Sequence, residues 1–574
     1  MFPGGLRLPA NKDRSSGVPI RTPPLPPELI LPLGAAALLV AVGDTVLKGQ
    51  MLAVRDNDGL PLHAPTSGHI SAVEPRPLHE APTGAGRCAV LIPDGRERWI
   101  ARLPAAAPET RSTAELLAAV RDAGLVGLGG GFPTAVKLAP PHPIDTLVVN
   151  GMECEPRITA DDRLMREDAP AIVAGIRLAA RVLGHPARIP IGIEDDKPEA
   201  AAAMQAAVTE ADSAAGMEVV VLPSRYPAGG ERQLIQSLTG RQVPSGGLPA
   251  DIGVVCFNVG TLHALHRALA DAEPLLSRVV TVTGSACQEP ANYRALLGTP
   301  IAHLLAASGH EPARSARLLV GGPMMGTPLT DLRAPVTATT GCILAAGAAE
   351  LAPAREPQPC IRCGLCADVC PASLLPQQLF RHAVAGNLEQ LERHHLFDCI
   401  ECGACAYLCP SAIPLVDHYR AAKAAIRTRR DDRARADRAR RRFAAHQART
   451  ARRSAERARR QAALATDAVA GEATAIAPAP TVATDLVREA RSRAQAATPR
   501  RAQLERMLRA VESRVAQLET ELAALDTETS EAQRKALLAR LQQARLDGGL
   551  ARRRLAALPA EPAEPAAADD EARQ

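Results

Sequence analysis

The chain has 574 residues, a formal net charge of +5 and 46% apolar residues. It is long enough for several domains of roughly 100–200 residues each, and its apolar content is that of globular proteins. The small net charge argues against nucleic acid as the main partner. No run of about eighteen apolar residues occurs, which excludes a predicted transmembrane helix.

The N-terminus lacks the charged and apolar regions of a signal peptide, so we expect the protein to stay in the cytoplasm. Residues 1–28 are rich in Pro and Gly and are predicted to lie as an arm on another domain. Residues 29–103 alternate short apolar runs with turn signals, notably at Val42–Gln50 and Ala64–Ile70. These two segments are similar to the barrel-sandwich fold of biotinyl and lipoyl domains. No lysine stands between them in a Met-Lys setting, so a structural role is predicted.

Residues 104–272 alternate helix and strand patterns, which predicts an α/β domain. Its first helix is predicted at Thr113–Ala123, with Thr113 as the N-cap. A glycine-rich loop follows, Gly127-Leu-Gly129-Gly130-Gly131-Phe132-Pro-Thr-Ala-Val-Lys137. Its amide groups could bind a phosphate, and Lys137 adds a cation. A simple glycine turn is the alternative interpretation.

A predicted strand at Thr146–Asn150 runs into Gly151-Met-Glu153-Cys154-Glu155. Two carboxylates at the end of a buried strand are costly without a partner or ligand, although a surface turn would also place them there. Further along, Gly229-Gly230-Glu231 forms a turn. Asn258 or Thr261 can cap the helix predicted at Leu262–Leu269, and the same helix start could hold a phosphate.

Residues 273–345 predict a small α+β module, with strands at Arg278–Thr283 and Leu318–Gly322 and a helix at Pro300–Ala307. Gly321–Gly326 is predicted to be a turn, and its sequence indicates no catalytic or binding role.

Residues 346–420 contain the strongest signal, two runs that each read C-x2-C-x2-C-x3-C-P. This is the bacterial ferredoxin spacing for [4Fe–4S] clusters, in which the fourth cysteine of each run binds the other cluster. One cluster is therefore assigned to Cys360, Cys363, Cys366 and Cys409. The second is assigned to Cys399, Cys402, Cys405 and Cys370. Zinc ribbons use paired C-x2-C knuckles, and disulfide frameworks occur in short secreted chains, so neither fits. A total of thirteen cysteines, eight of them cluster ligands, suits a reducing compartment.

Residues 421–574 differ in composition from the preceding domains and are predicted to form a helical tail. Residues 421–463 are dense in Arg and Ala and predict a charged helix without a clear apolar face, and residues 470–482 predict a linker. Leucine and valine then repeat at steps of four and three, which predicts a coiled coil at 503–558 that could turn and return. A helical hairpin that docks a partner is the plain interpretation. Binding of RNA or acidic lipid by the Arg-rich helix is the alternative, and residues 559–574 are predicted to be disordered.

Taken in order, these signals resemble the C subunit of Rnf ion-translocating oxidoreductase complexes over roughly residues 1–425. The middle part is similar to the NADH-binding flavoprotein subunit of respiratory complex I. The resemblance rests on the glycine-rich loop, Asn150–Pro156 with Asp161-Asp162-Arg163, the Gly229–Glu231 turn, Asn258–Thr261 and the two cysteine runs.

The resemblance implies a multidomain α/β protein with a barrel-sandwich domain, an FMN and NADH domain, a β-grasp (SLBB) module at 273–345 and a two-cluster ferredoxin-type domain. FMN would lie on Gly127, Gly129 and Gly130, with Lys137, Asn150 and Glu153 near its ribityl chain and ring. Asn258 and Thr261 would lie near its phosphate. Phe132 and the catalytic candidates Glu155 and Glu231 would line the NADH side.

The implied function is a peripheral electron-input subunit on the cytoplasmic face of the inner membrane. It would pass electrons between NADH, FMN and two [4Fe–4S] clusters and, through membrane subunits, to ferredoxin and an ion pump. Two alternatives stay open. One is a soluble NADH-dependent diaphorase subunit of a hydrogenase or reductase, and the other is a ferredoxin-like wiring scaffold with a vestigial flavin site.

Overall fold

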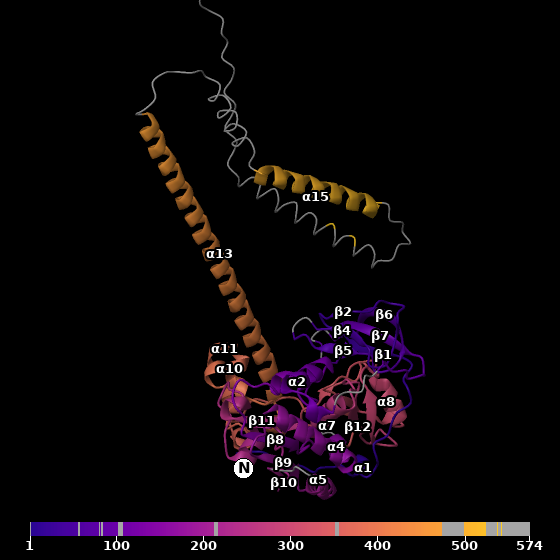
Figure 1. Ribbon diagram of the computed structural model, residues 1–574. Coiled ribbons are helices and arrows are strands. Elements are labelled where there is room, and N and C mark those ends of the chain that lie inside the picture. The colour runs from indigo at the N-terminus through magenta and orange to yellow at the C-terminus, as the bar shows by residue number, and fades with distance from the viewer. Residues whose placement is uncertain are drawn as a thin grey trace, which may run out of the picture. The chain divides into compact units, whose positions relative to one another are not determined.

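A computed structural model describes residues 2–472, except 56–57, 80, 82–83, 102–106, 212–215 and 351–354, and also residues 499–523, 537 and 541. The chain divides into two units, Met1–Arg440 and Arg441–Gln574, which are described separately. Figure 1 shows the elements of both units.

The first folded domain consists of two small antiparallel sheets. One sheet has the order β1-β7-β6-β3, formed by Leu29–Pro32, Ala85–Pro93, Gly68–Pro77 and Thr45–Val46. The other has the order β2-β4-β5, formed by Ala37–Leu38, Met51–Val54 and Pro61–His63. Their inner faces share one apolar core that includes Leu31, Val46, Leu52, Ile70 and Leu91. The alternation of short apolar runs and turns in the sequence arises from this arrangement.

The next domain is built on a parallel sheet with the order β10-β9-β8-β11. Its strands are Met217–Leu222, Ile189–Glu194, Thr146–Gly151 and Val254–Asn258. The central strands are apolar on both faces, as expected for a parallel sheet covered by helices. All four strands end at the same edge, and this edge positions the candidate site.

The helices of this domain are α2, α3, α4, α5, α6 and α7, formed by Thr113–Asp122, Thr134–Lys137, Ala160–Val182, Pro198–Glu210, Glu231–Thr239 and Val259–Ala270. Helices α2, α4 and α7 pack with the sheet in the largest apolar core of the described residues. Helix α6 covers the other face through Leu234 and Ile235. The predicted N-cap of α2 was wrong by one residue. Ser112 caps this helix through a capping box with Glu115, a Ser-x-x-Glu signal already present in the sequence.

The β-grasp module has the strand order β13-β12-β16-β14-β15, formed by Ala291–Leu296, Ser277–Thr283, Cys342–Ala346, Arg317–Val320 and Thr327–Pro328. Helix α8, Ile301–Ala307, packs on its core through Leu304 and Leu305. Strand β12 pairs with β13 and β16, two strands that the sequence did not indicate.

The cysteine-rich domain contains short helices α9, α10, α11 and α12, formed by Leu365–Asp368, Pro376–Val384, Leu388–Arg393 and Ala404–Tyr407. Figure 1 shows α10 and α11 beside the start of the long helix α13, Leu415–Glu472. Leu415, Tyr419, Ala422 and Ile426 recur at steps of four, three and four and are buried in the core of this domain.

The boundary predicted at residue 420 therefore falls inside α13, and the start of this helix does have an apolar face. Lys423 is buried and donates to the Cys399 carbonyl at 2.6 Å and to Glu401 at 2.8 Å. Further along, Arg429 and Arg430 both bind Glu392. Abundant Arg and Ala concealed this face in the sequence.

A chain stopped after Arg440 is expected to keep its iron, whereas a chain stopped after Arg420 should lose the iron bound by Cys399 and its partners. The shorter chain lacks Lys423 and the fully buried Ile426, whose loss alone should cost about 2–5 kcal/mol. Iron analysis and thermal unfolding of both truncated proteins would check this. Equal iron content in the two would show that α13 is not needed by this domain.

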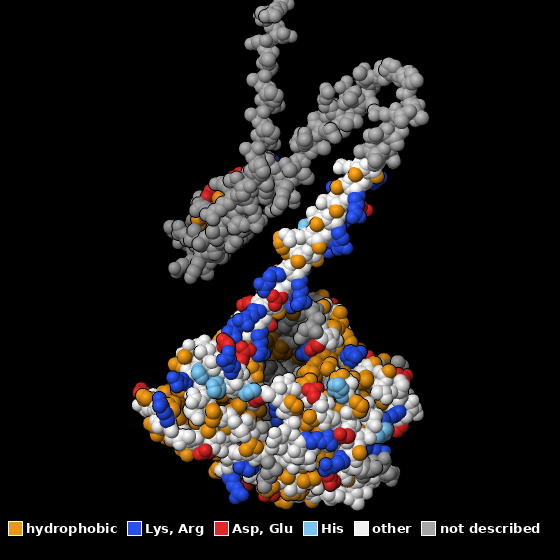
Figure 2. Space-filling view, turned by 90° about the vertical axis from the view of Figure 1, so that its left-hand side faces the viewer, with side chains coloured by type: hydrophobic (Ala, Val, Ile, Leu, Met, Phe, Trp, Pro, Cys, Tyr) orange, Lys and Arg blue, Asp and Glu red, His pale blue; other side chains and the backbone are white. Residues whose placement is uncertain are grey.

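In the second unit, residues 441–472 continue α13, and α15 extends over Pro499–Ala523. Along α13 the side chains of 431–464 are exposed, and Figure 2 shows Lys and Arg along the helix. From residue 473 onward, the linker predicted at 470–482 lies outside the described residues. Most of the predicted returning helix and residues 559–574, for which disorder was predicted, also lie outside them. Among the described residues, none of the helices combines the length and the hydropathy that a membrane crossing requires.

Candidate functional site

The glycine-rich loop closes on itself at the edge where the parallel strands end. Gly127 donates its amide to the Phe132 carbonyl at 2.8 Å, and Gly131 donates to the Gly127 carbonyl at 2.7 Å. A Cβ atom added to Gly129 or Gly130 would meet nothing within 4 Å, so this part of the loop borders open space. Gly131 has a φ of +69°, a conformation that side chains disfavour. An exposed backbone of this kind fits a phosphorylated cofactor such as FMN.

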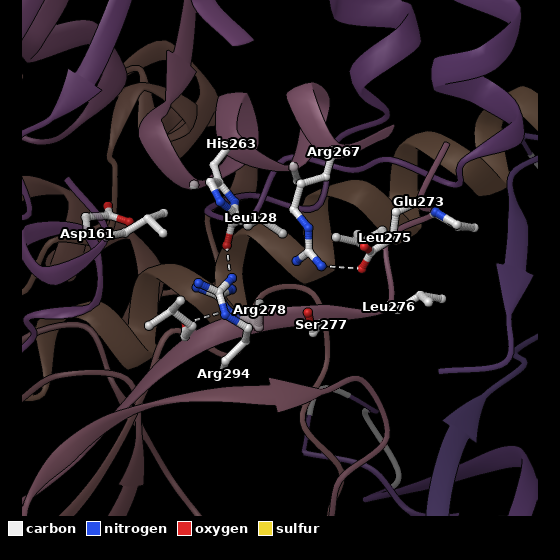
Figure 3. A pocket seen from close by; sticks show the side chains of 15 residues that line it. Leu128, Asp161, His263, Arg267, Glu273, Leu275, Leu276, Ser277, Arg278 and Arg294 are labelled. Carbon is white, nitrogen blue, oxygen red and sulfur yellow. Dashed lines mark hydrogen bonds and ion pairs between the residues drawn. The ribbon is translucent and has the colours of Figure 1, made fainter. Parts of the chain in front are cut away.

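Two hydrogen bonds to the backbone of Leu128 hold the glycine-rich loop in place. The Leu128 amide donates to the Thr261 hydroxyl at 3.0 Å, and Arg278 donates to the Leu128 carbonyl at 2.8 Å. Figure 3 shows Arg278 rising from β12 towards Leu128, with His263 and Arg267 of α7 above it. Burial lowers the pKa of Arg278 to about 10. The sequence did not indicate this arginine, because it belongs to the β-grasp module and reaches the loop only in the folded protein.

Asn258 connects β11 to α7 and is the N-cap of that helix. Its Oδ1 accepts the Gly260 amide at 2.9 Å, while its Nδ2 donates to Asp161 at 2.6 Å. Burial raises the pKa of Asp161, and the bond from Asn258 opposes this shift. Asn258 and Thr261 are thus brought together beside the loop, as the sequence order implied, with Asp161 added by the structure.

Glu153 is turned towards the start of α4. Its carboxylate accepts the amides of Asp161 at 2.7 Å and Asp162 at 3.1 Å, where a helix N-terminus favours negative charge. Burial raises its pKa to about 7, and nearby Lys12 acts in the opposite direction. Lys12 of the N-terminal arm donates to the Glu153 carbonyl at 2.5 Å. The carboxylate is therefore already bound within the protein.

A group of buried charges extends from Glu153 to the end of β9. Lys197 is 1% exposed and binds Glu194 at 3.0 Å and Asp196 at 2.5 Å. Lys12 lies 3.9 Å from Asp196. Sequence reasoning missed this group, because its members come from three separate segments. The adjacent acids in Glu194-Asp-Asp-Lys197 at a strand end were the available signal.

Asn150, at the end of β8, joins this strand to the Gly229–Glu231 turn. Its Nδ2 donates to the Gly229 carbonyl at 2.9 Å, and its Oδ1 accepts the Met152 amide at 3.2 Å. The Gly229 amide in turn donates to the Cys154 sulfur at 3.2 Å.

Lys137 and Glu231 form an ion pair, with Nζ and Oε1 2.5 Å apart. The Lys137 ammonium also lies 5.3 Å from the centre of the Phe257 ring. Both side chains of the pair are partly exposed, and Phe132 in the loop is 54% exposed. The structure therefore brings together Lys137 and Glu231, which are far apart in the sequence.

Glu155 lies elsewhere, against the β-grasp module. Its Oε1 accepts the amides of Met324 at 2.7 Å and Met325 at 3.0 Å, and burial raises its pKa. A Cβ on Gly322 would lie 2.2 Å from the Glu155 side chain. The Gly321–Gly326 turn, in which the sequence indicated no chemistry, therefore provides the binding site of this carboxylate.

The eight motif cysteines surround two separate cavities. Cys370, Cys399, Cys402 and Cys405 line the first and are called the inner set. Cys360, Cys363, Cys366 and Cys409 line the second and are called the outer set. No group of three or more His, Cys, Asp or Glu side chains in the described parts of the chain is arranged to hold a single ion. Four thiols around a shared cavity fit a cluster, with one cysteine of each set supplied by the other run.

The two sets differ in exposure. Cys402 and Cys405 of the inner set are buried, whereas Cys360 and Cys363 of the outer set are exposed. A Cβ on Gly403 would lie 2.7 Å from the Met324 carbonyl, so the inner loop packs closely on the β-grasp module.

Four known families match the chain in the order described. The RnfC barrel sandwich hybrid domain matches residues 1–96, the Nuo51 FMN-binding domain 120–267, the SLBB domain 279–328 and the 4Fe-4S dicluster domain 356–413. The predicted fold class is confirmed. The chain carries an FMN-binding domain and a 4Fe-4S dicluster domain.

Among solved structures, one that partly resembles the chain is the NAD+-reducing [NiFe]-hydrogenase in its H2-reduced state. It has 23% identity and a TM-score of 0.41, and it covers 56% of this chain and 65% of that chain.

Two curated relatives are named as the C subunit of an ion-translocating oxidoreductase complex. The protein from Pseudomonas aeruginosa strain PAO1 is 52% identical over 79% of this chain and 59% of its own length. The protein from Yersinia pestis bv. Antiqua strain Antiqua is 47% identical over 79% of this chain and 73% of its own length. The chain thus spans about three fifths of the first relative and nearly three quarters of the second. With this identity over most of its length, the chain belongs to the family of C subunits of ion-translocating oxidoreductase complexes.

Proposed function

We propose that this protein takes electrons from NADH and passes them through FMN to two [4Fe–4S] clusters, or in the reverse direction. When bound, FMN supplies the conversion between the two electrons of a hydride and the single electrons that each cluster accepts. Oxidation of NADH would release NAD+ and one proton to solvent, and the two electrons would move to the clusters one at a time.

The observation that carries this proposal is the direct contact between the flavin domain and the inner cysteine set. Tyr226 donates its hydroxyl to the Cys402 carbonyl at 2.5 Å. A Cβ on Gly230 would lie 3.4 Å from the Ile400 side chain, so the Gly229–Glu231 turn and the inner loop touch. Electrons leaving the flavin edge would meet the inner set first and the more exposed outer set afterwards.

The roles of the site residues follow from this arrangement. Gly127, Gly129 and Gly130 would hold FMN with their backbone, and Lys137 would supply a cation. Asn150, Glu153, Asn258 and Thr261 would shape the floor of the site, since their side chains already bind neighbouring protein groups. Phe132 and Glu231 would line the dinucleotide side, whereas Glu155 would support the site from its place against the Gly321–Gly326 turn.

The proposed partners are the membrane subunits of an Rnf-type complex, and through them ferredoxin and Na+ or H+ transport. The relatives' names support the complex, and the exposed outer set offers a place for electrons to leave. The protein would bind peripherally at the cytoplasmic face of the inner membrane.

Anaerobic purification tests this function. We expect one FMN and two clusters in each protein, and bleaching of both the flavin and the cluster absorbance on addition of NADH. Clusters present without flavin would indicate the wiring scaffold instead. Co-purification with a hydrogenase, and not with membrane subunits, would indicate the diaphorase.

The Glu231→Gln variant should keep its FMN but turn over NADH about tenfold more slowly, as expected when one charged interaction worth about 1.4 kcal/mol is lost. The glutamine keeps the shape beside Lys137 and removes only the negative charge. Flavin content and NADH oxidation with ferricyanide would measure this. Loss of flavin together with turnover would place Glu231 at the flavin and not at the dinucleotide.

A further inference from the structure

The N-terminal arm lies between the two domains that would exchange electrons. Leu6 pairs with Tyr226 as an isolated antiparallel bridge, with amide to carbonyl distances of 2.7 and 2.8 Å. On the other side, the Gly5 amide donates to the Val369 carbonyl at 2.9 Å. Val369 directly precedes Cys370 of the inner set. One short segment thus binds the backbone of both domains.

The fit at this place is close enough to require glycine. Gly4 and Gly5 have φ values of +59° and +82°. A Cβ on Gly4 would lie 2.6 Å from the Cys370 carbonyl oxygen, and a Cβ on Gly5 would lie 2.8 Å from the Tyr226 carbonyl oxygen. Both obstacles are backbone atoms, which cannot rotate away as the end of a side chain can.

The arm is also held at both ends of this segment. Phe2 is 4% exposed and packs in the apolar core formed by β8, β11 and α6. Lys12 is 8% exposed and binds the carbonyl of Glu153, whose carboxylate accepts amides at the start of α4. Leu6 and Leu8 pack with Tyr226, Val369 and Cys402 in one small apolar cluster. A segment of eleven residues therefore extends from the flavin-domain core, past the inner set, to the floor of the flavin site.

We propose that residues 2–12 are a positioning segment for electron transfer, which holds the inner cysteine set against the flavin domain at the Tyr226 contact. This rests on the proposed function. The segment touches no cofactor in this role; it sets the separation across which electrons pass. Because tunnelling rates fall exponentially with distance, a small displacement there slows transfer while leaving each centre intact.

Gly4→Ala and Gly5→Ala test this in the full-length protein, with Gly17→Ala as the matched control. Gly17 lies in the same arm with a φ of −79°, and a Cβ there meets nothing within 4 Å. In rapid mixing with NADH, the flavin of all three variants should bleach at the wild-type rate. Cluster reduction should slow several-fold in the first two variants only, since the added carbon widens the gap that electrons cross.

A purely structural role predicts another pattern, in which flavin reduction, iron content and cluster reduction fall together; that pattern, or wild-type cluster reduction in both variants, would overturn the proposal. Gly4→Ala could lose iron simply because its added carbon presses on Cys370. In that case the rate of cluster reduction in Gly5→Ala decides between the two roles, since the carbon added there meets Tyr226 instead.

Amide hydrogen exchange gives a second readout that does not need NADH. The Tyr226 amide donates a hydrogen bond to the Leu6 carbonyl. Its hydrogen should therefore exchange with solvent faster in Gly4→Ala and Gly5→Ala than in Gly17→Ala. Wild-type protein that NADH cannot reduce would contradict the proposed function, whereas unchanged Tyr226 exchange would contradict the positioning role. The two failures can therefore be told apart.

Discussion

Cys370→Ala is expected to remove the cluster bound by Cys399, Cys402 and Cys405, although Cys370 belongs to the other sequence run. These four side chains line one cavity, and Cys370 is the member that comes from the distant run. A [4Fe–4S] cluster of this type is held by four thiolates, so removing Cys370 leaves one iron without its protein ligand and weakens the attachment of the cluster. We expect the iron content to fall by about half, since one of two such clusters is affected.

The control for this experiment is Cys88→Ala. Cys88 is fully buried in the barrel-sandwich domain and belongs to neither cysteine set. It should keep all its iron and lose about 1 kcal/mol of stability, as expected for a small buried truncation. EPR of the dithionite-reduced proteins would identify which cluster remains. Loss of the signal of the exposed outer cluster alone would reverse the assignment of the two crossing cysteines.

The sequence predicted the domain order because each domain has a local signal. The C-x2-C-x2-C-x3-C-P runs, the glycine-rich loop and the alternation of α and β patterns can be recognised without knowing their neighbours. Strand β16 was missed, since it is stabilised by pairing with β12 and β14, which lie far from it in the sequence. Strand β13 was missed although it pairs with β12, the strand just before it. The start of α13 was misjudged for a related reason. Its few apolar positions become informative only when their partners in the cysteine-rich domain are known.

Some residues of the candidate site could be predicted from the sequence and others could not, again because local sequence does not reveal contacts between distant segments. Gly129 and Gly130 could be proposed from the sequence because free backbone is a property of the residue itself. Lys12 and Arg278 were missed, because each lies in a different domain and reaches the site only in the folded protein. Glu155 was selected for its place at a strand end. Its actual partners are two amides of the β-grasp module, which local sequence cannot reveal.

Lys137→Glu is expected to abolish FMN binding and, with it, NADH oxidation. The flavin phosphate is dianionic and the flavin ring gains negative charge on reduction, so the site needs at least one cation. In the wild-type protein Lys137 pairs with Glu231 at 2.5 Å. The substitution removes the cation and places the new carboxylate of residue 137 beside that of Glu231. Two unit charges about 5 Å apart interact by about 3 kcal/mol at an effective dielectric constant of about 20. A change of this size weakens FMN binding by about a hundredfold or more.

Lys48→Glu is a close control for Lys137→Glu, because Lys48 has the same kind of surroundings in the barrel-sandwich domain. It pairs with Glu97 at 3.3 Å and lies 5.1 Å from the centre of the Trp99 ring. The general cost of reversing a charge beside an acid and an aromatic ring should therefore be similar in the two variants. Lys48→Glu should keep full flavin and NADH oxidation, whereas Lys137→Glu should lose both and still show two clusters that dithionite reduces. If purified Lys137→Glu protein retained full flavin content, FMN would not lie beside this lysine, and the site would have to be sought on another face of the glycine-rich loop.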